Sequence, residues 1–174
     1  VTKTESHIIK PSNKFYKLLR EKCHIAKNIY NHANYLVRQE FVNNGKWLRY
    51  VQVEKLLKTD SDYPDYWELE LANSSQQILR DLDSNWKSFF KSIKDWAKHK
   101  DKYTGRPKLP KYIKKDGVKE FALTTNQVKL KSDRLVHFPK SLNGFTIKAK
   151  FAEKEFVKFR QCRIVPKNDF IVVE

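Results

Sequence analysis

The spacing of hydrophobic residues changes along the chain, and the first part is helical in pattern. Between Phe15 and Phe41, apolar side chains recur every three or four residues, which predicts one long helix. Ser12 is a candidate N-cap for this helix, and Gly45 is its expected stop. A shorter helix is predicted over residues 51–58, before a turn that contains proline.

A third helix is predicted after this turn. Asn73 together with Gln76 resembles a capping box, although Ser74 is an equally suitable cap. The first part of the chain is therefore expected to be a helical lobe. The apolar stripe of the third helix consists of Leu79, Leu82, Trp86, Phe89, Phe90, Ile93 and Trp96.

After residue 119 the period shortens to two, which is typical of strands. Residues 6–11 at the start of the chain are also strand-like and have no partner nearby in sequence. This pattern predicts an α+β fold with a small antiparallel β-barrel or sandwich. The opening strand would complete the barrel, and the helices would then be an insertion between its first strand and the rest. The later strands are predicted over 120–124, 127–131, 134–139, 144–151, 157–165 and 170–174, the last two as a hairpin. The domains are then 1–11 (first strand), 12–97 (helical insertion), 98–119 (basic linker) and 120–174 (rest of the barrel).

Charge is distributed unevenly along the 174 residues. The net charge is +16, with a pI near 9.8. Residues 1–97 hold 16 Lys and Arg against 12 Asp and Glu, whereas residues 98–174 hold 20 against 8. Such a field favours a polyanionic partner, with nucleic acid first and an anionic membrane surface second.

Composition narrows the class of protein further. A chain of this length with 40% hydrophobic residues can bury a core without disulfides. Cys23 and Cys162 form no C-x-x-C motif, which fits a reducing cytoplasm. No apolar run predicts a membrane span, and no signal-peptide pattern opens the chain. Because the chain has no methionine, we expect a processed product or a fragment of a longer protein.

Residues 98–119, here called the strap, carry nine cations against two acids. Pro107 and Pro110 favour an extended backbone, so less conformational entropy would be lost on binding. Tyr103 and Tyr112 could stack on unpaired bases or sugars. The alternative is a solvated linker between two lobes, and we expect the free strap to be partly mobile. The cations that could follow a phosphate backbone are Lys98, Lys100, Lys102, Arg106, Lys108, Lys111, Lys114, Lys115 and Lys119.

The start of the third helix is a second candidate binding surface. Amide side chains pair with adenine edges in a major groove, arginine pairs with guanine, and a helix N-terminus attracts phosphate. The alternative is an ordinary helix start. The candidate residues are Asn73, Ser74, Gln76, Gln77 and Arg80.

Metal-binding patterns are poor, so no cofactor is predicted for this chain. A calcium loop that began at Asp60 would need glycine at its sixth position and glutamate at its twelfth, and the chain has neither. Cys23 and His24 are adjacent on one predicted helix and point apart. A solvated acidic loop explains residues 60–70 better.

Two stretches in this order resemble a known family. They are "SSQQILRDLDSNWKSFFKSI" (74–93) and "YTGRPKLPKY" (103–112). The first contains Gln76, Leu79-Arg80-Asp81-Leu82 and Phe89-Phe90, and the second contains Gly105-Arg106-Pro107-Lys108. Together they resemble the amino-terminal half of TnpB, also called OrfB, a transposase-type protein of small insertion sequences.

The resemblance implies both a fold and a function. The fold would be a wedge-like β-barrel interrupted by a helical recognition lobe. The function would be that of an RNA-guided DNA endonuclease whose two lobes hold a structured guide RNA and double-stranded DNA with a short transposon-adjacent motif. The resemblance implies that this motif is contacted near Gln76. The catalytic carboxylates and their Mg²⁺ would belong to a RuvC-like nuclease domain, whose Gly-Ile-Asp-x-Gly motif does not occur in this chain. We therefore expect this chain to bind nucleic acid without cutting it.

Three other functions are left open. One is a helix-turn-helix DNA-binding domain of a transposase, formed by the helices around Gly45. Another is a basic module that docks an acidic protein. The third is a complete metal-dependent nuclease built from the acidic loop with Asp81 and Asp83. Two-metal chemistry needs carboxylates that converge on the ions, whereas side chains two positions apart on a helix point in different directions.

Overall fold

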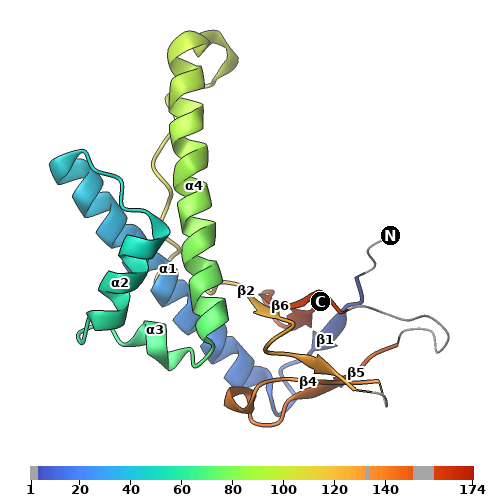
Figure 1. Cartoon of the computed structure of the whole chain (residues 1–174). Coiled ribbons are helices and arrows are strands. Elements are labelled where there is room, and N and C mark those ends of the chain that lie inside the picture. Colours follow the sequence, from blue (N-terminus) through green and yellow to red (C-terminus); the bar gives the residue numbers. More distant parts are fainter. Residues whose placement is uncertain (1–3, 132–133, 151–158) are drawn as a thin grey trace.

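The structure is a computed structural model, and it describes residues 4–131, 134–150 and 159–174. It has a mixed α+β fold in which four α-helices lie beside two small antiparallel sheets (Figure 1). The α+β prediction is confirmed. The helices are α1 (Tyr16–Asn44), α2 (Tyr50–Thr59), α3 (Asp65–Glu68) and α4 (Ala72–Lys98).

The ends of the long helices agree only partly with the predicted caps. Gly45 ends α1 in the left-handed region, with φ of 66°, as predicted. The prediction of Ser12 as the cap is wrong, because α1 begins at Tyr16. The side chain of Asn13 accepts a hydrogen bond from the backbone N–H of Phe15. Helix α4 begins at Ala72 and has no side-chain cap, so neither candidate cap residue has that role. The side chains at its start are used in tertiary contacts instead.

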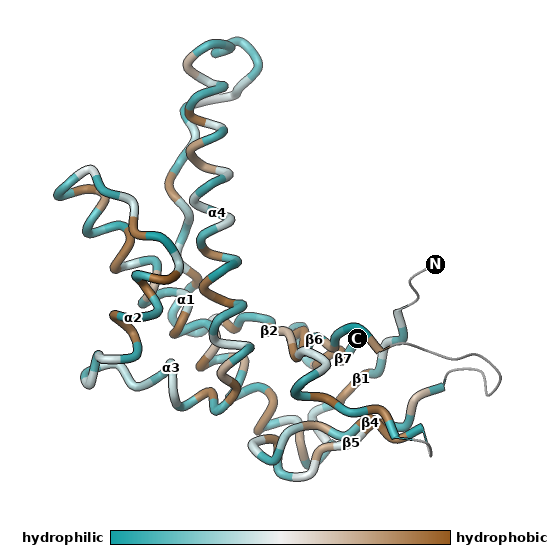
Figure 2. The backbone as a smooth tube through the Cα atoms, in the orientation of Figure 1, coloured by the Kyte–Doolittle hydropathy of each residue, from teal (hydrophilic) through white to brown (hydrophobic). Residues whose placement is uncertain are grey.

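Helices α1 and α4 pack together around an aromatic cluster. The side chain of Trp86 is fully buried, and its ring lies 5.4 Å from the ring of Phe41 and 5.8 Å from that of Phe90. These positions belong to the apolar stripes of the two helices. Figure 2 shows hydrophobic residues where helices and sheets meet and hydrophilic residues at the far tip of α4. The stripes therefore build the core of the helical lobe.

The strands form two sheets. One has the order β1-β7-β6-β2 and the other the order β3-β4-β5, with antiparallel pairing throughout. Among the described residues the sheets are open and form no closed barrel. Parts of the predicted strands at 144–151 and 157–165 lie outside the described residues. The strands are β1 (His7–Ile9), β2 (Phe121–Thr124), β3 (Lys129–Leu130), β4 (Leu135–His137), β5 (Thr146–Lys148), β6 (Gln161–Pro166) and β7 (Ile171–Val173).

The opening strand pairs with the last strand of the chain. In β1 and β7, His7 lies opposite Val173 and Ile9 lies opposite Ile171. In sequence, all four helices lie between β1 and β2, which are the two edge strands of this sheet. The base of α1 also contacts the sheet region, because Arg20 donates a hydrogen bond to the carbonyl of Lys167 at 3.0 Å.

Both cysteines lie in this core, so we expect neither to react with a thiol reagent in the native state. Burial raises the pKa of Cys23 and that of Cys162 to about 12 each. Titration with an aromatic disulfide should therefore detect no reactive thiol in native buffer and both thiols in denaturant. Rapid labelling of either cysteine in native buffer would contradict this arrangement of core residues.

No helix in the described part of the chain is long and apolar enough to span a membrane.

Candidate nucleic-acid interface

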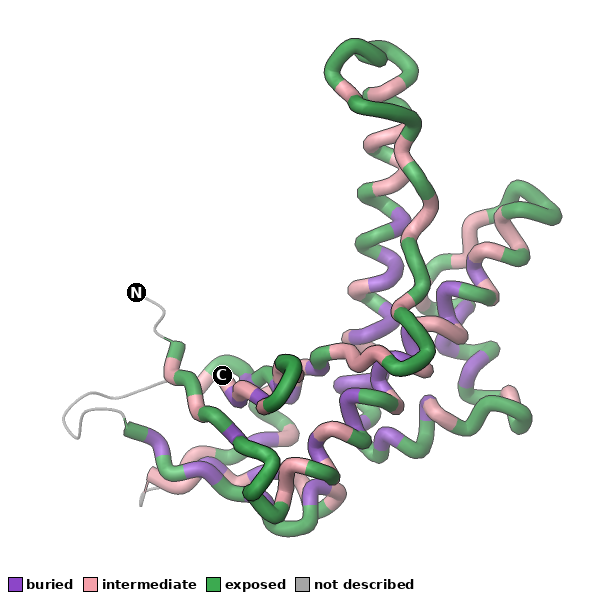
Figure 3. The backbone as a smooth tube through the Cα atoms, turned by 180° about the vertical axis from the view of Figure 1, so that it is seen from behind, coloured by how far each residue is buried: buried purple, intermediate pink, exposed green. Residues whose placement is uncertain are grey.

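The strap and α4 form a hairpin that projects from the rest of the molecule. Lys98 is the last residue of α4, and Lys100–Lys102 form a short 3-10 turn. The prediction of an extended strap from residue 98 is thus wrong for residues 98–102, which end α4 and form the 3-10 turn. From Tyr103 onward the strap is extended and runs back alongside α4 (Figure 1). Figure 3 shows that the tip of this hairpin is mostly exposed.

Aromatic residues order the tip. The cationic groups of Lys100 and Arg106 lie 5.3 and 5.9 Å from the ring of Trp96. The hydroxyl of Tyr103 donates a hydrogen bond of 2.6 Å to Asp95, and this bond lowers the pKa of Asp95. The tip thus presents cations at fixed positions on the end of a helix.

The body of the strap is hydrogen-bonded along α1. The backbone N–H of Lys119 donates to the carbonyl of Cys23 at 3.0 Å, and that of Ile113 donates to the side chain of Asn31 at 2.9 Å. The body is therefore tied to α1 by hydrogen bonds, and its partial mobility in the free protein stays a prediction. Three side chains of α1 donate to strap carbonyls: Lys27 to Lys115 at 2.9 Å, Asn31 to Ile113 at 2.8 Å and Asn34 to Pro110 at 3.0 Å.

These contacts use the strap backbone and leave most of its charged side chains unpaired. Of the nine strap cations, Lys119 alone forms an ion pair within the described part of the chain, with Asp81 at 3.8 Å. Lys108, Lys111, Lys114 and Lys115 are all exposed. A fixed backbone with unpaired cations is an arrangement that suits a phosphate chain.

Tyr112 lies on the same segment. Its side chain is 41% exposed, and the guanidinium of Arg38 lies 4.7 Å from the ring centroid. The contact with Arg38 holds one face of the ring, so the exposed surface is available for stacking. Residues 110–115, which include Tyr112, thus lie along one face of α1.

The first residues of α4 lie elsewhere and support a strand. The hydroxyl of Ser74 is nearly buried and donates to the carbonyl of Ala122 in β2 at 2.6 Å. The Asn73 side chain donates to the hydroxyl of Thr124 at 3.3 Å. Both residues therefore fix the helical lobe against the larger sheet.

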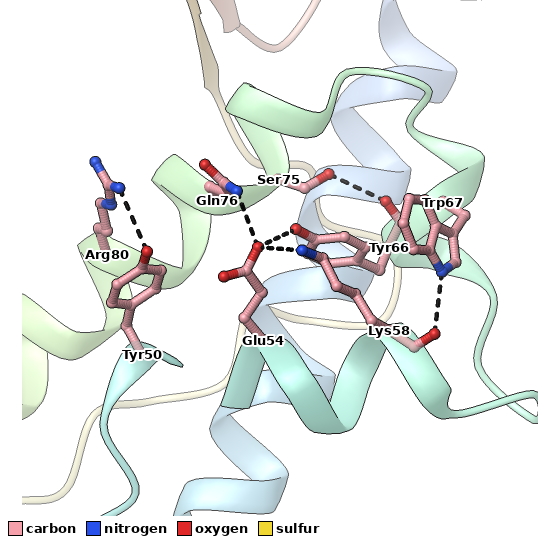
Figure 4. A network of polar contacts seen from close by, with 8 residues as sticks. All are labelled: Tyr50, Glu54, Lys58, Tyr66, Trp67, Ser75, Gln76 and Arg80. Carbon is pink, nitrogen blue, oxygen red and sulfur yellow. Dashed lines mark hydrogen bonds and ion pairs between the residues drawn. The ribbon is translucent and has the colours of Figure 1, made fainter. Parts of the chain in front are cut away.

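Gln76 and Arg80 face α2 (Figure 4). Gln76 donates to a carboxylate oxygen of Glu54 at 3.0 Å, and Arg80 donates to the hydroxyl of Tyr50 at 3.4 Å. Gln77 instead donates along its own helix to Asp81 at 3.0 Å. Arg80 is exposed and Gln76 is half-buried, so these two remain within reach of a partner on the α2 side.

Glu54 is the centre of this second cluster. The hydroxyl of Tyr66 and the ammonium group of Lys58 reach the same carboxylate oxygen, at 2.7 and 2.8 Å (Figure 4). Burial alone would raise the pKa of Glu54, but the hydrogen bonds from Lys58, Tyr66 and Gln76 outweigh burial and lower the pKa. The carboxylate therefore stays charged and holds Gln76 in one orientation.

The two candidate surfaces are separated along α4. With 27 residues, α4 is about 40 Å long, and the tip of the strap lies at the opposite end from Gln76. Two candidate surfaces remain, one along the strap and one between α2 and α4 that contains Gln76 and Arg80. A single extended ligand would have to follow the whole hairpin to contact both.

The carboxylates named for the nuclease alternative have separate partners. Asp83 is 8% exposed and forms ion pairs with Arg49 at 3.0 Å and Lys87 at 2.9 Å. Burial alone would raise the pKa of Asp83, but its bonds to these two cations outweigh burial and lower the pKa. Asp81 instead faces Gln77 and Lys119. Across the described ranges, no group of three His, Cys, Asp or Glu side chains could hold a metal ion.

Sequence reasoning missed the polar residues of α1 that hold the strap. Lys27, Asn31 and Asn34 lie four and three residues apart, so they form one helical face beside the apolar stripe. Lys27 and Asn34 are nonetheless buried. The signal in the sequence was this row of polar residues at helical spacing. Such a row indicates that a polar segment packs on that face of the helix.

Comparison with protein-family models gives no match, and comparison with curated proteins gives none either.

Proposed function

We propose that this chain is the nucleic-acid-binding region of a TnpB-like RNA-guided DNA endonuclease of an insertion sequence. In this proposal it holds a structured guide RNA and double-stranded DNA with a short adjacent motif, and it does not cut either. In this proposal the two sheets are an open, wedge-like form of the barrel that the sequence resemblance implies. The four helices are the recognition lobe.

The observation that carries the proposal is the strap. Its carbonyls are bound by α1, while its cations have no carboxylate partners apart from the Lys119 pair, within the described residues. A cation that only needed solvation would not need a fixed backbone. Fixing the backbone lowers the entropy lost on binding, and the unpaired cations supply the attraction to phosphate.

The surface between α2 and α4 is the proposed contact for duplex DNA. Arg80 is exposed, and Glu54 fixes the orientation of Gln76. A side chain held in one orientation before binding reads a base edge more selectively than a free one. RNA would then lie along the strap and be recognised by backbone and shape.

A salt titration of the wild-type protein tests the proposal. Binding to an RNA hairpin, a DNA duplex and polyglutamate would be measured by fluorescence anisotropy between 50 and 300 mM salt. If about six strap cations contact phosphate, log K for the RNA hairpin should fall against log salt with a slope of about −5, at about 0.9 for each phosphate contact on a double helix. Neither nucleic acid should be cleaved when Mg²⁺ is added.

Two outcomes would overturn the proposal. If polyglutamate binds as tightly as RNA, the basic surface docks an acidic protein. If Mg²⁺ brings cleavage that a chelator stops, the chain carries its own nuclease site. Heat-denatured protein serves as the control for charge-driven binding that needs no fold.

A further inference from the structure

A groove of about 440 Å³ lies between α4 and the strap. Ser88 and Ser92 of α4 lie one turn apart on one wall, and Lys108 and Lys111 of the strap line the other. None of these four side chains has a hydrogen-bond or ion-pair partner among residues 4–131, 134–150 and 159–174. Among the described residues, no carboxylate lines the groove. Two cations and two hydroxyl groups without acidic neighbours form a site for an anion.

The groove also has an apolar part. The ring of Phe89 lines it together with Pro107 and Pro110. Phe89 is held by the aromatic cluster, with ring centroids 5.2 Å from Phe90 and 5.9 Å from Trp86. A free phosphate ion would not require this surface. A ligand with an anionic group and a flat ring would use both parts.

We propose that this groove binds one unpaired nucleotide of a nucleic-acid strand that lies along the strap. The phosphate meets Lys108 and Lys111, the sugar meets the α4 hydroxyl groups, and the base lies against Phe89 and the prolines. The nucleotide must be unpaired, because a paired base has its ring faces covered by its neighbours in the stack. This inference rests on the proposed function and adds the chemical form of the ligand.

The test is a pair of matched double variants. Ser88→Leu with Ser92→Leu fills the groove with two larger, uncharged side chains and removes the two hydroxyl groups. Ser12→Leu with Ser61→Leu makes the same change at exposed positions outside it. Each protein is titrated with a labelled single-stranded oligouridine of about ten nucleotides and with a blunt RNA duplex. Equal thermal midpoints would show that both variants fold.

The groove variant should bind the single strand about tenfold or more weakly than the control variant, and the duplex within about threefold. Uridine monophosphate should not compete at micromolar concentration, because it lacks the neighbouring phosphates. Equal binding by the two variants, or an equal loss for strand and duplex, would overturn the inference while leaving the proposed function in place. If the wild-type protein binds neither ligand in a salt-dependent way, both fail. Tight competition by the mononucleotide would assign the groove to a free nucleotide.

Discussion

Replacing Asn34 with leucine should lower the free energy of unfolding by about 2–4 kcal/mol, although the two side chains have similar volumes. Asn34 is fully buried. Its amide donates to the carbonyl of Pro110 at 3.0 Å, and its side-chain oxygen accepts the indole N–H of Trp86 at 3.1 Å. Leucine would leave a buried donor without an acceptor and a strap carbonyl without a donor. Urea unfolding followed by tryptophan fluorescence measures the loss.

Asn43→Leu is the matched control for this variant. Asn43 lies near the end of the same helix and is exposed, so its replacement should change stability by no more than about 0.5 kcal/mol. Adding Trp86→Phe to Asn34→Leu removes the unpaired indole donor. The double variant should then be more stable than the sum of the single effects predicts. Equal losses at Asn34 and Asn43 would contradict the connecting role given to Asn34.

Hydrogen exchange gives a second readout of the same substitution. The amide N–H groups of Ile113 and Lys119 are bonded to α1. Loss of the Asn34 contact should speed exchange at Ile113, which is nearer to Pro110, more than at Lys119. A uniform increase would mean that the whole protein unfolds more easily and that the strap is not released separately.

The helices could be predicted because their stripes are long and regular. Leu79, Leu82 and Trp86 repeat at helical spacing, and all three are buried. The helix ends were harder to predict, because polar side chains there have competing uses. Ser74 would cap a helix well in isolation, but its hydroxyl makes a bond to β2 that local sequence cannot specify. Tertiary contacts decided these boundaries.

The strap shows the limit of composition as a guide. Its prolines and lysines are typical of a solvated linker or of a binding segment, and neither interpretation specifies where the backbone lies. The answer was in another element, the polar row of α1, whose partners are 76 to 88 residues away in sequence. The groove between α4 and the strap was likewise not predictable, because Ser88 and Ser92 appear in sequence as ordinary solvent-facing residues of a helix. They become a candidate site only when the strap returns beside them.

Changing Lys108, Lys111, Lys114 and Lys115 together to alanine should have the largest effect on binding. The slope of log K against log salt for the RNA hairpin should become shallower by about three to four units, because each phosphate contact on a double helix contributes about 0.9. The fold should be retained, since these side chains are exposed and the contact of Lys115 with Lys27 uses the backbone carbonyl. Affinity and slope would be measured by anisotropy at several salt concentrations.

A second quadruple variant separates local contacts from net charge. It changes four other exposed lysines that form no ion pair within the described residues. They are Lys17 in α1, Lys46 in the loop after α1, Lys55 in α2 and Lys94 in α4. Changing them to alanine removes the same four charges, so it should weaken long-range attraction but leave the slope nearly unchanged. If both variants lose the same slope, the protein attracts nucleic acid only through its total charge, and the ordered strap is not the binding element. If the strap variant alone loses the slope, the phosphates lie along the strap, because only direct neutralisation of a phosphate releases its counterion.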